Sequence, residues 1–243
     1  MTIAEKLAQI AENEQAVYNK GVADGKQNDY DTFWDALQNE GTLTDYNYTF
    51  AGWKASLKAF FKPKYSMTPT RSYQMFYSNY AIEDLPALCE ECDVTLSFSN
   101  STSMDAVFYN CLNLTHLGTI NTTNATNLGN MCGACIRLET VDNLILKADG
   151  TQTMPSCFNR CLALKNITIT GTIGTSGLSF KDSEGLTAAS LTSILTALTK
   201  DSTTASGKSI TFATASQAII NANTAAKAQF DAAVAAGWTI AFA

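Results

Sequence analysis

Histidine, proline and charged side chains are scarce in this chain of 243 residues, which has one histidine, four prolines and 16% charged residues. The formal net charge is −6 and no run of basic residues occurs, so we expect no nucleic-acid partner and no anionic membrane surface as a partner. No stretch approaches the roughly 18 apolar residues of a membrane span. The segment from Met1 to Lys6 lacks the apolar region of a secretory signal peptide.

Catalytic motifs are absent as well. The lone His116 lies between Thr115 and Leu117, at a position whose side chain should face solvent. We expect no carboxylate to orient it. No nucleophile elbow, zinc-protease helix, phosphate loop or calcium loop occurs. We expect the acidic pairs Glu83-Asp84 and Glu90-Glu91 to be solvent-exposed charges in loops. We therefore predict no catalytic, cofactor or metal site, although carboxylates that meet only in the fold leave an enzyme open as an alternative.

One short pattern, in contrast, returns four times between about residues 70 and 169. It has the form F-x-x-(C/N)-x-x-(L/I)-x-x-(L/V/I) and starts at Phe76, Phe108, Cys132 and Phe158, with spacings of 32, 24 and 26 residues. Apolar positions three apart suit a short helical turn that leads into a strand. One unit cannot bury its own apolar edge, so neighbouring units must stack. The expected core consists of Phe76, Leu85, Phe108, Cys111, Leu114, Leu117, Cys135, Leu138, Val141, Phe158, Cys161, Leu164 and Ile167.

The seven cysteines are an odd number, and the repeat requires no disulfide. Cys111, Cys135 and Cys161 share one phase, so we expect a column of buried, reduced thiols, with a disulfide ladder or metal site as the alternative. Cys89 and Cys92 form a C-x-x-C pair, but the glutamates between them should raise the thiol pKa values, against the need of a redox motif. Reduced thiols fit a protein that is assembled in the cytoplasm.

The fuller pattern T-x-M-x-x-(M/V)-F-x-x-C-x-x-L-x-x-L, clearest in residues 102–111 and 125–135, resembles the leucine-rich repeats of BspA-like bacterial proteins. In the second stretch Cys132 stands where that family has phenylalanine. The family includes surface adhesins and proteins encoded in prophages of gut bacteria. The resemblance implies an α/β fold, a leucine-rich-repeat solenoid of short strands plus short helical turns over residues 70–178. A similar fold does not imply that the same ligand is bound.

Residues 1–40 are predicted to form a helical leader for attachment or oligomerisation. An apolar stripe at heptad-like steps, interrupted at Glu14, consists of Ile3, Leu7, Ile10 and Val17. Two heptads do not decide whether this stripe packs on its own domain or binds another chain. The amino-acid sequences of residues 4–13 and of Phe61 to Tyr65 also resemble the leader of prophage-encoded repeat proteins.

Residues 41–69 are rich in aromatic side chains and are predicted to cap the first repeat, because the open edge of a terminal unit must be covered. A sugar site is the alternative, since aromatic rings stack on ligand faces. Residues 179–243 are predicted to be a C-terminal α/β cap that extends the repeat sheet and closes its far end. In this cap Ser183 replaces the repeat cysteine, and the last residues resemble the closing unit of the same prophage-type proteins.

These features together predict a non-enzymatic, phage virion-associated structural or recognition protein of a tail, baseplate, fibre or head decoration, assembled in the bacterial cytoplasm. The leader would bind other virion proteins or a second copy, and the repeats would face a host-surface protein or glycan. The first alternative is a BspA-like adhesin on the bacterial cell surface. The second is a glycan-active enzyme with the aromatic segment as its site.

Overall fold

The computed structural model describes residues 66–200 and 207–243. The predicted leader with Ile3, Leu7, Ile10 and Val17, and the aromatic cap up to residue 65, lie outside the described residues.

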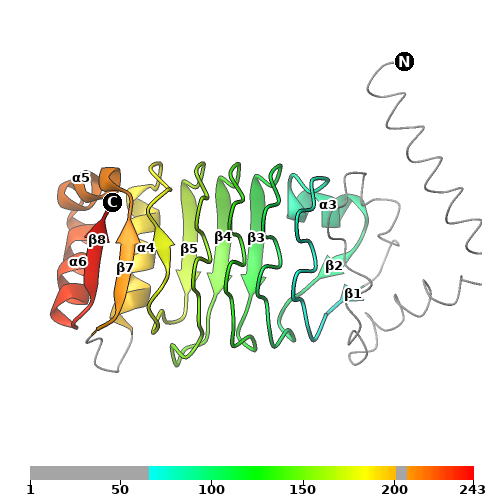
Figure 1. Ribbon diagram of the computed structural model, residues 1–243, viewed down its shortest axis with the longest axis horizontal. Helices are drawn as coiled ribbons and strands as arrows, with labels where there is room; N and C mark the ends of the chain where they lie inside the picture. Colours follow the sequence, from blue (N-terminus) through cyan, green and yellow to red (C-terminus); the bar gives the residue numbers. More distant parts are fainter. Residues whose placement is uncertain (1–65, 201–206) are drawn as a thin grey trace, which may run out of the picture.

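The described chain forms an elongated stack of parallel units, with strands in three separate sheets (Figure 1). A two-stranded sheet contains β1 (Ser66–Met67) and β2 (Thr95–Leu96). A three-stranded parallel sheet contains β3 (His116–Asn121), β4 (Thr140–Ile145) and β5 (Asn166–Thr170). A second three-stranded parallel sheet contains β6 (Ser179–Phe180), β7 (Ser209–Phe212) and β8 (Thr239–Phe242). The helices are α3 (Leu85–Glu91), α4 (Ala188–Thr199), α5 (Thr214–Ala222) and α6 (Thr224–Ala235).

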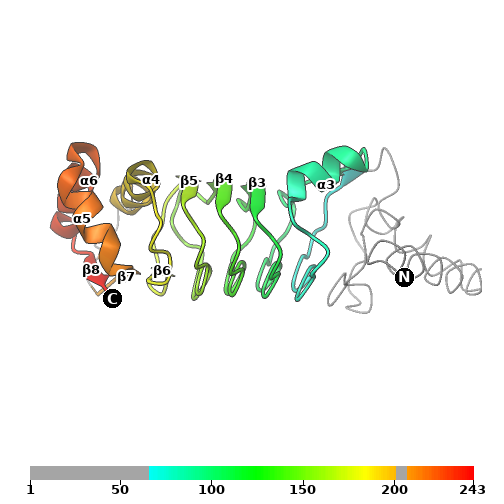
Figure 2. The ribbon, with the colours of Figure 1, turned by 90° about the horizontal axis from the view of Figure 1, so that it is seen from above.

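The predicted leucine-rich-repeat solenoid is wrong, because the strands do not continue as one repeat sheet. Figure 2 shows α3 and α4 at the two ends of the row formed by β3, β4 and β5, while β6, β7 and β8 lie on the opposite side of the stack. The C-terminal unit therefore does not extend the repeat sheet as predicted but builds its own. The result is an α/β protein with two small three-stranded parallel sheets.

Helix α4 ends the sheet of β3, β4 and β5, because serine side chains of α4 accept hydrogen bonds that a further strand would otherwise accept. The backbone N–H groups of Ile167 and Ile169 on β5 donate to the hydroxyls of Ser190 and Ser193, at 2.9 and 2.8 Å. Thr187 caps the start of α4 by accepting from the N–H of Ser190. Hydrogen-bonding groups at the β5 edge are thereby satisfied without another strand, as buried backbone groups require.

On the side opposite β3 to β5, the three-residue spacing produces stacked turns rather than the expected helical turns. The N–H groups of Phe76, Phe108 and Cys132 donate to carbonyls of the next unit at 2.8 to 2.9 Å. Ala106 and Asn110 adopt positive φ angles of 54° and 60°, which interrupt a right-handed helix. All thirteen expected core side chains are buried, none more than 5% exposed.

Candidate functional site

The exposed side of β3 to β5 carries a polar strand face, which we define as Thr119, Asn121, Thr140, Asn143, Asn166, Thr168 and Thr170. These residues are exposed or half-buried, and on β5 they alternate with buried residues, whereas on β4 the exposed Asp142 stands directly before Asn143. The register sets Thr119 beside Asn143 and Thr140 beside Asn166. The Thr170 hydroxyl donates to Asn143 Oδ1 at 3.0 Å. The threonine and asparagine side chains offer neutral hydrogen-bond donors and acceptors, next to the charged and exposed Asp142 on β4.

His116 lies at the start of β3 beside this face, and the prediction that no carboxylate orients it is wrong. Its Nδ1 is 2.9 Å from Asp84 Oδ2, and its Nε2 is 3.0 Å from Asp142 Oδ1. Asp84 is not a solvated loop charge as expected, because its other oxygen, Oδ1, accepts from the N–H of Ala87 and caps α3. Partial burial lowers the pKa of His116, but the hydrogen bonds and charges of both aspartates outweigh burial and raise the pKa.

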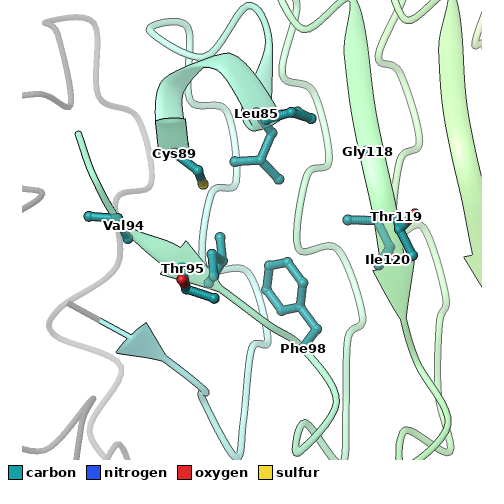
Figure 3. A pocket seen from close by; sticks show the side chains of 10 residues that line it. Leu85, Cys89, Val94, Thr95, Phe98, Gly118, Thr119 and Ile120 are labelled. Carbon is teal, nitrogen blue, oxygen red and sulfur yellow. The ribbon is translucent and has the colours of Figure 1, made fainter. Parts of the chain in front are cut away.

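An apolar hollow of about 290 Å³ lies between α3, β2 and β3 (Figure 3). Leu85, Pro86 and Cys89 line it from α3, Phe98 follows β2, and Ile120 comes from β3. Gly118 allows α3 to approach β3, since a Cβ atom there would lie 2.7 Å from Pro86 Cγ. Phe98 also packs edge-on against Phe108, which ties this wall to the core.

The cysteine column is part of the core rather than a reactive site. The Sγ atoms of Cys111, Cys135 and Cys161 donate to carbonyls of the preceding unit, namely those of Phe76, Phe108 and Cys132, at 2.9 to 3.1 Å. At the same phase in the following unit, the Ser183 hydroxyl donates to the Cys161 carbonyl at 2.9 Å. Burial raises the pKa values of Cys135 and Cys161 well above the usual range. None of the seven cysteines, all of which lie within residues 66–200, forms a disulfide bond.

Cys89 differs from the other cysteines because it is only half-buried. Burial raises its pKa to about 11, with a further contribution from Cys92. The direction of the shift is the one expected from the sequence, but its largest cause is burial rather than the neighbouring glutamates. The thiol therefore stays protonated at neutral pH and is a poor nucleophile.

Within residues 66–200 and 207–243, no group of three histidine, cysteine or acidic side chains is arranged to hold a metal ion. The helices of this same part of the chain are too short or too polar to cross a membrane.

The fold and these features define an α/β protein of stacked parallel units with a neutral polar strand face. Comparison with known protein families, with curated proteins and with solved structures finds no match to this chain.

Proposed function

We propose that the chain is a non-enzymatic component of a phage particle and that it binds a host-surface protein or glycan through the polar strand face. The observation that carries this proposal is that three adjacent strands all present exposed or half-buried threonine and asparagine side chains, with Thr119 beside Asn143 and Thr140 beside Asn166. Recognition of a neutral partner by such a face depends on hydrogen bonds and shape rather than on charge. The resemblance of residues 102–111 and 125–135 to BspA-like repeats supports the same assignment.

The arrangement of the acidic groups supports a non-catalytic role. Asp84 and Asp142 meet in space, but both are hydrogen-bonded to His116, and Asp84 also caps a helix. With both ring nitrogens occupied, His116 has no nitrogen available to take a proton from a substrate. A glycoside hydrolase would instead need a carboxyl pair that flanks a substrate-sized cleft.

Analysis of purified phage particles tests whether the chain is part of the particle. We expect mass spectrometry to find the chain in particles, and electron microscopy with a labelled antibody to locate it at their outer surface. A chain that is absent from particles and present on intact bacterial cells would contradict the proposal and favour the BspA-like surface adhesin, the second candidate that the repeat resemblance supports.

A matched pair of variants tests the face. Asn166 on β5 and Asn221 on α5 are both exposed asparagines, but only Asn166 belongs to the polar strand face. Asn166→Arg should reduce adsorption of particles to host cells, because a bulky charge replaces a neutral hydrogen-bonding group, and Asn221→Arg should leave adsorption unchanged. Equal adsorption of both variants and the unmodified particle would remove this face from the proposal.

A further inference from the structure

We propose that Asp84, His116 and Asp142 form a pH-dependent clasp that fixes α3 over the apolar hollow, and that loss of a proton from His116 frees α3 and opens the hollow. The clasp joins three successive units, because Asp84 starts α3, His116 starts β3 and Asp142 lies on β4.

The geometry requires a charged imidazole. Both ring nitrogens of His116 lie within hydrogen-bond distance of a carboxylate oxygen, at 2.9 and 3.0 Å. A carboxylate can only accept, and a neutral imidazole has a single N–H, so both bonds form together only with the imidazolium. When one nitrogen loses its proton, its lone pair faces a carboxylate oxygen and that bond is lost.

Asp84 connects this proton to the helix. One of its oxygens accepts from His116 and the other accepts from the N–H of Ala87 at 2.8 Å, so the clasp holds the capping side chain in place. The preceding residue is held independently, because the N–H groups of Thr115 and His116 donate to the Glu83 carbonyl. Asp84 and His116 also form an isolated parallel backbone bridge, so the attachment at Glu83 and Asp84 stays fixed and loss of the clasp acts on the seven-residue helix that follows.

The charged groups that face His116 are both acidic. Asp84 faces it from α3 and Asp142 faces it from β4, while its neighbours on β3, Leu117 and Gly118, carry no charge. Lys165, which directly precedes β5, is paired with Glu139 at 3.1 Å. The pKa of His116 is accordingly raised in the folded protein despite partial burial. The clasp is thus complete below the ordinary histidine pKa of about 6.5 and is lost as the pH rises through the higher folded pKa.

Cys89 provides a reporter of the opening. It lies on α3, lines the hollow and is half-buried, whereas the other six cysteines are buried. Movement of α3 away from β3 exposes the Cys89 thiol first.

The first experiment follows the ring protons of His116 by NMR as the pH is raised. His116 is the only histidine, so its signals need no further assignment. We expect a midpoint above about 6.5 for the unmodified protein, and lower midpoints for Asp84→Asn and Asp142→Asn. Asparagine at position 84 can still cap α3, so that variant removes the charge and keeps the cap. A midpoint at or below the ordinary value, or one unchanged in both variants, would overturn the clasp.

The second experiment measures labelling of Cys89 by N-ethylmaleimide, with the labelled peptide identified by mass spectrometry. At each pH, the labelling rate of Asp142→Asn is divided by that of the unmodified protein. The pH dependence of the thiolate fraction then cancels from the ratio. At pH 6 the variant should react about two- to fivefold faster, the ratio expected for one partly exposed ion pair. The ratio should fall to one above the NMR midpoint. Lys165→Gln, which breaks the neighbouring ion pair, should label at the unmodified rate. Equal rates for Asp142→Asn and the unmodified protein at pH 6 would show that the clasp does not hold α3.

Discussion

At the scale of single residues, the column of Cys111, Cys135 and Cys161 shows what the repeat requires at this phase. Each position holds a small side chain that donates one hydrogen bond to the preceding unit. Ser183 meets the same requirement with oxygen in place of sulfur. The requirement is therefore for size and a donor rather than for thiol chemistry.

This requirement predicts a difference between two substitutions. Cys135→Ala removes the bond to the Phe108 carbonyl and should lower the free energy of unfolding by about 1 kcal/mol. The cost stays modest because that carbonyl also accepts from the N–H of Cys111. Cys135→Ser keeps a donor and should cost less than the alanine variant. Denaturant unfolding of both variants checks the order, and a larger loss for serine would show that apolar packing dominates the position.

A pair of leucines tests the core. Leu138 is completely buried in a central unit, whereas Leu162 is 55% exposed. Leu138→Ala should lower the free energy of unfolding by about 2–5 kcal/mol because it leaves a cavity. Leu162→Ala should change that free energy by less than about 0.5 kcal/mol. Thermal or denaturant unfolding measures both, and equal losses would contradict the assignment of these residues to the inside and outside of the stack.

At the scale of elements, α4 replaces a strand at the edge of β5 through serine side chains. Ser190→Ala should lower the free energy of unfolding by about 1–3 kcal/mol, because it leaves the buried N–H of Ile167 without its acceptor. Hydrogen exchange of the Ile167 amide should accelerate in the same variant.

Thr192→Ala is the matched control on the same helix. The Thr192 hydroxyl donates to the Ala188 carbonyl within α4 and not to β5. Alanine also favours a helix, so the exchange of the Ile167 amide should stay unchanged. Accelerated exchange in both variants would mean that α4 as a whole, and not the serine hydroxyl, protects the β5 edge.

The sequence predicted the buried phases of the repeat, because each apolar residue returns at the same step from Phe76 to Ile167. It did not predict that helices would replace strands at both ends of the row. For α3 a signal was present: Asp84 followed by Pro86 is a helix start, and the first spacing exceeds the next two by six to eight residues, about the length of α3. The contacts of His116 were not predictable from local sequence, since both aspartates come from other units.

At the scale of the whole molecule, attachment and recognition are predicted to be separate. The stripe of Ile3, Leu7, Ile10 and Val17 precedes the described stack and is not needed for the repeat pattern. Deletion of residues 1–28 should give a folded, monomeric protein that no longer enters particles or self-associates. Circular dichroism, sedimentation and mass spectrometry of purified particles measure the three properties. An unfolded product would show that the leader belongs to the domain core, and undiminished incorporation would locate attachment elsewhere.

The stacking of units along one axis also determines how the chain responds to mechanical force. The described chain begins at β1 and ends at β8, at opposite ends of the long axis (Figure 1). Tension between these ends would separate the units one after another, since the units of the described part of the chain hydrogen-bond to their direct neighbours. Each released unit of 24 to 26 residues would add roughly 80–90 Å of extended chain. In the role proposed above, a particle bound to a cell in flowing liquid would be retained by a tether that lengthens in steps, and each step would dissipate energy before the attachment itself is loaded.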